Sequence, residues 1–357
     1  MRILFISGRE PTYTRNAVIL KGLKKCGIEV IECTDCSKSY AVRYPKVIIN
    51  FLLKLMRKDT FDAVFVGFFG QPLVKIVRKA LKDKSIVFDA FLSAYDTMCF
   101  ERKNFRPNSI AGKFFYWLDK SSCEIADTII LDTNAHIDYF VNTFNLPKEK
   151  FHRVFVGADD EYFYPRNVER NDGKFRVFYY GTYRPLQGIE YIIKAAKLLE
   201  PYEDIEFIVV GKGPERGKID KLARDLNVKN VRFIDWIPYE KLPVEIAKSD
   251  VCLGGHFSNI DKAKRVIAGK TFQFIAMKKP VIVGDNPANR ELFEDRENAL
   301  FVEIANSDAL AKGILELREN EDFRENIAEK GYRTFMEKCT PEAIGRELYC
   351  IIREVVG

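Results

Sequence analysis

Short apolar runs alternate with longer amphipathic stretches twice along this chain, and this alternation limits the fold more than any other feature. In the first half, six apolar runs of strand length are separated by segments with helical spacing, and the second half repeats the rhythm. Strands buried on both faces and separated by helices are typical of parallel sheets covered by helices. The pattern predicts an α/β protein of two doubly wound, Rossmann-like domains facing a central cleft.

The predicted elements follow directly from these runs. Strands are expected at 2–7, 28–33, 61–69, 85–90, 127–133, 152–157, 175–181, 205–211, 231–235, 251–255, 280–284 and 299–303. Helices are expected at 15–26, 71–82, 134–144, 188–200, 214–226, 307–319, 321–337 and 341–356. The polar stretch 164–174 has no period and predicts a linker. We therefore expect domains at 1–164 and 165–337, and a C-terminal helix at 338–357 that packs back on the N-terminal domain.

Composition fits a protein without a membrane span. The 357 residues exceed one ordinary core of about 150 residues, and no apolar run reaches the roughly 18 residues that a spanning helix needs. The first residues predict a strand rather than a signal peptide, so we expect a cytoplasmic protein. The eight cysteines are scattered and only three histidines are present, so a metal site is not expected.

Charge is spread unevenly between the two halves. Residues 1–150 carry a net charge of +8 and the remainder −2, so an anionic partner is expected at the N-terminal half. Segment 38–58 mixes six basic residues with an apolar stripe. Two interpretations stay open for it: peripheral contact with an anionic membrane, at its inner face, or a helix packed on the sheet with a basic outer face.

Glycine-containing loops follow three of the predicted strands. Because ligands of such sheets bind at the carboxyl ends of strands, these loops are candidate binding sites. Gly8 permits a tight turn beside an anion, although a plain strand-to-helix turn explains it equally well. In the loop from Gly181 to Gly188, Arg184 supplies charge and Thr182 a hydroxyl for a diphosphate.

The third glycine-containing loop and the loop at Trp236 each have two competing interpretations. Gly211 and Gly213 either contact the same ligand or allow a helix to pack closely on its strand. Trp236 and Ile237 either hold a planar base, with backbone groups at its edge, or fill the domain core.

Cations gather at the start of another predicted helix. Lys270 lies in its first turn, where a positive charge is unfavourable for the helix dipole. An anion bound between Lys270, Arg265 and the helix amides would remove that conflict. The alternative is a solvated run of charges.

Taken in order, these motifs resemble the retaining glycosyltransferases of the GT-B fold, in the group known as family four (glycosyl transferases group 1). The shared series is the glycine-rich loop, V-G-x-G-P, F-x-x-W-I-P, a helix of K-x-x-x-F-x-x-M-x-K-P-V-I type and an N-R-E-L-F loop. The resemblance covers nearly the full length and is strongest across 154–303. It implies a metal-independent hexosyltransferase that uses a nucleotide-diphosphate sugar, retains anomeric configuration and needs no cofactor beyond its donor.

The chain departs from the family pattern at four positions. Thr182 and Gln187 stand where the family has arginine and lysine, and Arg265 and Gln273 stand where it has two glutamates. Gln273 can still hydrogen-bond a ribose diol. Arg184, Lys270 and Arg265 are expected to stabilise the departing diphosphate.

The expected acceptor is a glycan, lipid-linked or small molecule bound to the N-terminal domain, not a nucleic acid. Asp89, at a strand end, is the candidate for orienting or deprotonating the acceptor hydroxyl. Further acceptor candidates are Ser93, Tyr95, Asp96 and His136. Loop capping by Asp96 and helix capping at His136 are their structural alternatives.

Three rival functions remain at this point. A nucleotide-sugar epimerase of the same shape would turn over its donor without an acceptor. A two-lobed solute-binding protein predicts a signal peptide or anchor, which is not visible. A non-catalytic nucleotide-sugar binder would bind nucleotide without releasing sugar.

Overall fold

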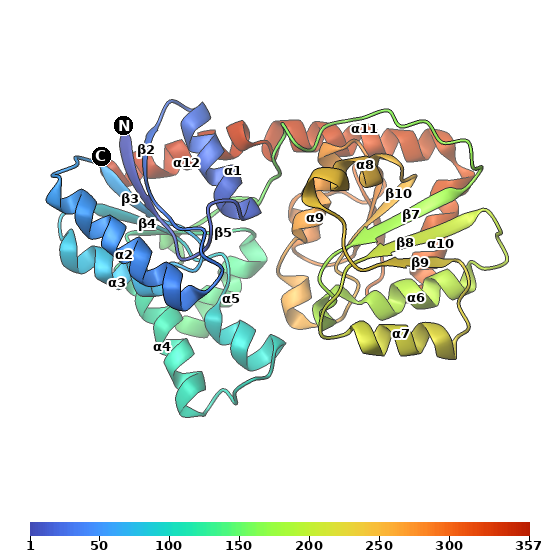
Figure 1. The fold of residues 1–357 in the computed structure, drawn as a ribbon, viewed down its shortest axis with the longest axis horizontal. Coiled ribbons are helices and arrows are strands. Elements are labelled where there is room, and N and C mark those ends of the chain that lie inside the picture. Colours follow the sequence, from blue (N-terminus) through green and yellow to red (C-terminus); the bar gives the residue numbers. More distant parts are fainter. The chain divides into compact units, whose positions relative to one another are not determined.

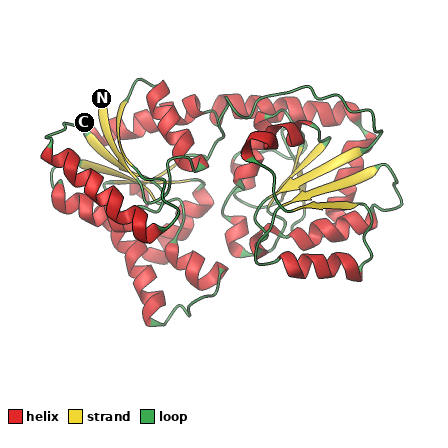
Figure 2. Ribbon diagram, viewed as in Figure 1, coloured by secondary structure: helices red, strands yellow, loops and turns green.

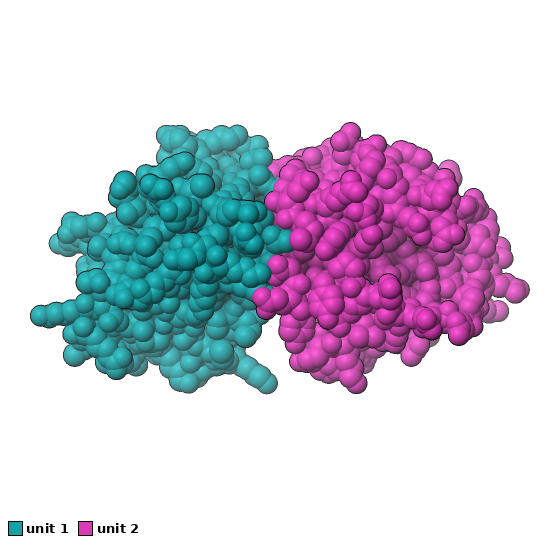
Figure 3. Space-filling model, turned by 90° about the horizontal axis from the view of Figure 1, so that it is seen from above, with its two compact units in different colours: residues 1–157, 340–357 teal, residues 158–339 magenta.

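The computed structural model describes residues 1–357, which form two compact units: residues 1–157 with 340–357, and residues 158–339 (Figure 3). Each unit is a six-stranded parallel sheet flanked by helices (Figures 1 and 2). The predicted pair of Rossmann-like domains is confirmed, and each predicted apolar run overlaps a strand, the run 152–157 at only two residues.

The N-terminal unit has the strand order β2-β1-β3-β4-β5-β6. Its strands are β1 (Arg2–Ile6), β2 (Glu29–Cys33), β3 (Ala63–Val66), β4 (Ser85–Asp89), β5 (Thr128–Leu131) and β6 (Phe151–Arg153). Its helices are α1 (Thr14–Lys25), α2 (Tyr40–Met56), α3 (Gln71–Ala80), α4 (Ile110–Ile125), α5 (Asn134–Phe144) and α12 (Pro341–Val356). The strand order reverses between β1 and β3.

The C-terminal unit repeats this plan with the order β12-β11-β10-β7-β8-β9. Its strands are β7 (Phe175–Tyr180), β8 (Ile205–Val210), β9 (Val231–Ile234), β10 (Val251–Gly255), β11 (Val281–Gly284) and β12 (Leu300–Val302). Its helices are α6 (Ile189–Leu198), α7 (Arg216–Asp225), α8 (Leu242–Ala247), α9 (Gly269–Ala276), α10 (Ser307–Glu319) and α11 (Glu321–Lys338). Here the order reverses between β7 and β10.

The boundary between the two units lies earlier in the chain than the predicted linker. Ala158 already belongs to the C-terminal unit, where its backbone N–H donates to the Cys339 carbonyl at 3.2 Å. Phe163 is buried, and its ring lies 5.6 Å from that of Tyr239. Residues 158–164 therefore pack with the second core, which a polar linker pattern could not reveal.

The C-terminal helix α12 packs on α1 within the N-terminal unit (Figure 1). Gly22 and Gly345 meet at the crossing, where a Cβ on Gly345 would lie 2.2 Å from the Gly22 carbonyl oxygen. Only residues without a side chain allow the two backbones to approach this closely.

Segment 38–58 forms α2, which combines features of both predicted interpretations. Val47 and Phe51 are fully buried against the sheet. The outer face is not only basic, because large apolar side chains there remain exposed: Val42, Ile49, Leu52, Leu53 and Met56. None of the helices combines the length and hydropathy needed to cross a bilayer.

Candidate functional site

The best candidate for a binding site lies where the strand order of the C-terminal sheet reverses. In doubly wound sheets the loops separate at this point, and ligands bind at the carboxyl ends of the strands. Gly181 follows β7 and Gly255 ends β10. A Cβ on Gly181 would lie 3.5 Å from Lys270 Nζ, and one on Gly255 would lie 3.9 Å from it. The lysine therefore reaches from α9 to this point of reversal.

Lys270 is a buried cation held by neutral groups. Its Nζ donates to Gln187 Oε1 at 2.6 Å and lies 4.4 Å from the Tyr179 ring centroid. The Tyr179 hydroxyl donates to the same Gln187 oxygen at 3.1 Å. Desolvation lowers the pKa of Lys270 from 10.5 to about 7, and no ion pair with a carboxylate offsets this burial. An anion beside the ammonium would stabilise its charged form.

The loop around this lysine is held in place by its second glycine. Gly188 has a φ of +67°, and a Cβ there would lie 2.5 Å from the backbone nitrogen of Ser258. Ser258 Oγ donates to the Leu186 carbonyl at 2.7 Å. In this loop Arg184 is partly exposed and Thr182 is exposed, so both can meet a ligand from solvent.

Gly211 and Gly213 are accounted for by packing. A Cβ on Gly211 would lie 1.9 Å from the Gly181 carbonyl oxygen, and one on Gly213 would lie 2.6 Å from the Tyr183 carbonyl oxygen. Arg216 donates to the carbonyl oxygen of Gly211 at 3.1 Å. These contacts fit the close-packing interpretation and support the loop that carries Arg184.

Trp236 does not fill the domain core. The loop after β9 leaves it 67% exposed, while the neighbouring Ile237 is partly buried. The core-filling interpretation is therefore wrong for Trp236, and its ring is accessible to a planar ligand.

The two remaining donor candidates come from α9 and from the turn before it. Gln273 is buried, and its Oε1 accepts a hydrogen bond from the Tyr180 hydroxyl at the end of β7. Arg265 is partly buried and ends the 3₁₀ turn Asp261–Lys264. Gln273 thereby contacts the strand that leads to the lysine loop.

Three buried polar residues beside this site were not named as candidates from the sequence, although Asn289 opens the N-R-E-L-F motif. His256 Nδ1, Asn286 Nδ2 and Asn289 Oδ1 are buried and have no hydrogen-bond partner. The other amide atom of Asn289 donates to the Gly284 carbonyl at 2.8 Å and to that of Gly255 at 3.4 Å. Unpaired buried polar atoms are costly, so this cluster suits a ligand rich in hydroxyls.

His256 is neutral at physiological pH. Desolvation, reinforced by the nearby charge of Lys270, lowers its pKa from 6.5 to about 3. A neutral imidazole has one donor and one acceptor nitrogen, and it adds no further charge beside the lysine. A histidine directly after the glycines that end β10 was the sequence signal for this residue.

Asp89 does not fit its predicted role as an acceptor base. Its carboxylate has no exposed surface and is paired with Arg15, whose Nε lies 3.1 Å from Oδ2 and whose Nη2 lies 3.1 Å from Oδ1. Arg15 also donates to the carbonyl oxygens of Val154 and Phe155, each at 2.7 Å. The structure therefore shows Asp89 tying α1 to the carboxyl end of β4, with no open path to a substrate.

The predicted acceptor residues after β4 also point inward. Ser93 Oγ donates to Asp119 Oδ2 at 2.7 Å, and the backbone N–H of Tyr95 donates to the same oxygen at 2.8 Å. Asp96 is 3% exposed. Desolvation raises the pKa of Asp119 from 3.8 to about 6. Asp119, which the motifs did not indicate, organises this loop from within α4.

His136 and Gly8 also serve the structure of the N-terminal unit rather than a binding site. His136 Nδ1 lies 2.7 Å from Asp132 Oδ1, and both side chains are 2% exposed. A Cβ on Gly8 would lie 2.1 Å from the Phe69 carbonyl oxygen. Gly8 therefore serves close packing between the loops after β1 and β3, where the strand order of this sheet reverses.

Those two loops bring together an arginine and several aromatic rings. The guanidinium carbon of Arg9 lies 5.0 Å from the Tyr13 ring centroid, and its Nη1 donates to the Tyr40 hydroxyl at 2.5 Å. The rings of Phe68 and Phe69 stack at 4.3 Å. Phe68 is buried, whereas the rings of Tyr13 and Phe69 are partly exposed and that of Tyr40 is 37% exposed. Exposed ring surface beside a cation makes this group a better acceptor surface than the buried residues after β4.

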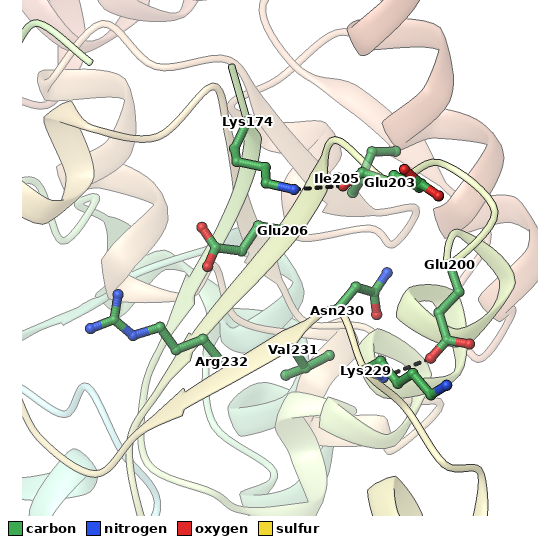
Figure 4. Close-up of a pocket in the computed structure, with 9 residues that line it drawn as sticks. All are labelled: Lys174, Glu200, Glu203, Ile205, Glu206, Lys229, Asn230, Val231 and Arg232. Carbon is green, nitrogen blue, oxygen red and sulfur yellow. Dashed lines mark hydrogen bonds between the residues drawn. The ribbon is translucent and has the colours of Figure 1, made fainter. Parts of the chain in front are cut away.

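A hollow of about 510 Å³ lies at the opposite edge of the C-terminal sheet. It is lined by Lys174, Glu203, Ile205, Val231 and other residues at the amino ends of β7, β8 and β9 (Figure 4). The Lys174 ammonium already donates to the Glu203 carbonyl at 2.7 Å. Because ligands bind doubly wound sheets at the other edge, we do not assign the site here.

Residues 160–334 match the model of the family described as glycosyl transferases group 1. The C-terminal unit belongs to this family. The stretch includes the lysine loop, the exposed tryptophan and the three residues with unpaired polar atoms, so the candidate site lies within the matched region. The predicted family is thereby confirmed.

Relatives extend this glycosyltransferase likeness into the N-terminal unit. Alpha-D-kanosaminyltransferase of Streptomyces kanamyceticus is 24% identical over 74% of this chain and 68% of its own length. A Campylobacter jejuni N-acetylgalactosamine-N,N'-diacetylbacillosaminyl-diphospho-undecaprenol 4-alpha-N-acetylgalactosaminyltransferase is 21% identical over 86% of this chain and 81% of its own. Other matches cover as little as 19% of the relative.

Solved glycosyltransferase structures share the fold. Anabaena HepE in complex with UDP superposes with a TM-score of 0.73 at 15% identity, covering 99% of this chain and 100% of HepE. At this identity the likeness establishes the GT-B fold, and the chemistry has to be argued from the residues.

Proposed function

We propose that this glycosyltransferase moves a hexose-type sugar from a nucleotide-diphosphate donor to an acceptor, with retention of configuration. The observation that carries the proposal is Lys270: a buried ammonium at the point of strand reversal, paired only with neutral groups. The HepE structure with UDP supports a nucleoside diphosphate as the anion that Lys270 binds.

Different residues contact the three parts of the donor. Lys270 and Arg184 meet the diphosphate, the ring of Trp236 meets the base, and His256, Asn286 and Asn289 meet the hydroxyls of the sugar. As the glycosidic bond breaks, negative charge grows on the departing phosphate oxygen. A fixed cation in a site with little water stabilises that charge more in the transition state than in the ground state.

No carboxylate base is required by this proposal. Asp89 is engaged with Arg15, and in a retaining transfer the leaving phosphate can itself take the proton of the acceptor hydroxyl. The proposal assigns charge stabilisation to side chains alone. Transfer is expected to persist in the presence of a chelator.

The test is nucleotide binding by the intact protein. A thermal-shift panel of UDP, GDP and their sugar conjugates should raise the melting temperature for the correct base by mass action. Lys270→Ala should weaken that binding about tenfold or more, as expected for a lost charged hydrogen bond. Lys197→Ala, on the surface of α6, is the matched control. A wild-type nucleotide response in Lys270→Ala would remove the proposed role.

Two other activities remain outcomes of a second assay. Sugar release that depends on an acceptor supports transfer, whereas donor turnover without acceptor indicates an epimerase of the same fold. Binding without any release of sugar indicates a non-catalytic nucleotide-sugar binder.

The acceptor part of the proposal is a glycan or a lipid-linked molecule at the Arg9 and aromatic surface. The Campylobacter relative is named for an acceptor on diphospho-undecaprenol, which supports a lipid-linked substrate. The exposed apolar stripe of α2, with Lys46, Arg57 and Lys58 beside it, would contact the anionic membrane that carries such an acceptor.

A further inference from the structure

A second exposed apolar surface lies on α4, outside every site described above. Ile110 is 91% exposed, Phe114 50% and Trp117 54%. These positions are spaced i, i+4 and i+7 and therefore share one face of the helix. Phe105, in the preceding loop, is 39% exposed. Large aromatic side chains of this kind are rarely left in water as a group.

The rings of this surface are packed against one another and against a lysine. Phe114 and Trp117 have ring centroids 6.0 Å apart, and those of Phe105 and Phe115 are 5.8 Å apart. Lys75 Nζ, from α3, lies 3.1 Å from the Trp117 ring centroid. The inner face of the indole is thereby fixed on a cation, and the rest of the ring faces solvent.

The loop before α4 is folded tightly onto the first turn of the helix. Ser109 caps the helix by accepting a hydrogen bond from the Gly112 backbone N–H at 3.1 Å. A Cβ on Gly112 would lie 2.4 Å from the carbonyl oxygens of both Arg106 and Pro107. The surface is thus held in shape before any partner arrives, which lowers the entropy lost on binding.

The charges in the segment that carries this surface are all positive. Segment 102–118 contains four basic residues and no acidic residue: Arg102, Lys103, Arg106 and Lys113. All four side chains are exposed. Aromatic side chains surrounded by lysine and arginine are suited to the interface of an anionic bilayer. There the aromatic rings enter the headgroup region and the cations meet lipid phosphates.

We propose that the surface formed by Phe105, Ile110, Phe114 and Trp117 docks the N-terminal unit on an anionic lipid membrane. The segments that connect β2, β3 and β4 to their next strands run in the same direction across the sheet, so α2, α3 and α4 cover one face. The apolar stripe of α2 belongs to the same helical layer, in which α3, with Lys75, Arg78 and Lys79, lies between α2 and α4. Membrane docking does not depend on sugar transfer, so this proposal can be tested independently of the proposed reaction.

The chain holds two tryptophans, Trp117 and Trp236, so one substitution gives a direct probe. In Trp236→Phe, fluorescence reports on Trp117 alone. Vesicles of phosphatidylcholine with phosphatidylglycerol should shift its emission to the blue, because the indole leaves water. Vesicles of phosphatidylcholine alone should give little shift. An unchanged spectrum with the anionic vesicles, or an equal shift with both kinds, overturns the proposal.

Vesicle sedimentation tests the surface without fluorescence. The double variant Ile110→Ser, Phe114→Ser should lower partitioning to anionic vesicles about tenfold, while Leu198→Ser, at an exposed position on α6, should not. Circular dichroism and the nucleotide thermal shift should match those of the wild type, which separates docking from donor binding. Full retention of binding overturns the proposal, as does a blue shift of Trp117 that grows with protein concentration without lipid, which would assign the surface to a second copy.

Discussion

At the scale of single residues, Lys270 sets the character of the donor site. Its ammonium is buried against Gln187 and the Tyr179 ring, with no carboxylate to neutralise it. A group of this kind loses its proton near neutral pH unless an anion binds beside it. Nucleotide binding and protonation should therefore be coupled at this position.

The coupling predicts a pH dependence with a definite sign. The pKa of Lys270 is about 7 in the unliganded protein, and a bound diphosphate should raise it. Above pH 7 binding must then take up a proton, so affinity falls as pH rises, by up to about tenfold per pH unit. Titration calorimetry near pH 8 in buffers of different protonation enthalpy measures this uptake. In Lys270→Met both the uptake and much of the affinity should disappear. A similar uptake in that variant would place the titrating group elsewhere.

At the scale of elements, close glycine contacts decide how helices dock. The crossing of α1 and α12 depends on Gly22 and Gly345, because a Cβ on either residue would meet backbone at 2.2 Å. Backbone cannot move aside as a flexible side chain does. The crossing is thus specified by the absence of two side chains rather than by the presence of apolar ones.

Gly345→Ala should force α12 away from α1 and destabilise the protein by about 1–3 kcal/mol, the usual cost of overpacking. Gly217→Ala, in α7, is the control because a Cβ there meets nothing within 4 Å. It should stabilise slightly, by about 0.5–1 kcal/mol, through the better helix propensity of alanine. Thermal denaturation of both variants measures the difference. Equal stability of the two would show that the crossing tolerates a methyl group.

At the scale of the whole molecule, the N-terminal unit is built from both ends of the chain. Residues 340–357 pack with residues 1–157, although residues 158–339 separate them in sequence. The Ser85 hydroxyl also donates to the Val355 carbonyl at 2.8 Å. The last helix is therefore part of a core that begins with the first strand.

A chain that ends at Cys339 should lose the fold of one unit and keep that of the other. Removal of α12 exposes the apolar face of α1 and the start of β4 beside it. Hydrogen exchange should show faster exchange in β1–β6, with β7–β12 protected as in the full chain. Unchanged protection in β1–β6 would show that α12 is dispensable to that unit.

The sequence alone determined the elements and the family. Periodicity and turn chemistry are local, so the strand and helix pattern predicted the two sheets, and the ordered motifs predicted the glycosyltransferase likeness. Lys270 and Gln187 were picked out for the same reason, since each lies in a loop or first turn with its own local signal. The cations at the C-terminal strand ends needed no knowledge of distant contacts.

Only the tertiary structure decided what the polar side chains touch. Asp89 and Arg15 are 74 positions apart, and their pairing turned a candidate base into a buried support. Trp236 is exposed rather than buried, and His256, Asn286 and Asn289 became candidates only through their unpaired buried atoms. Burial and pairing depend on which distant segments pack together, and no local pattern in the sequence specifies that packing.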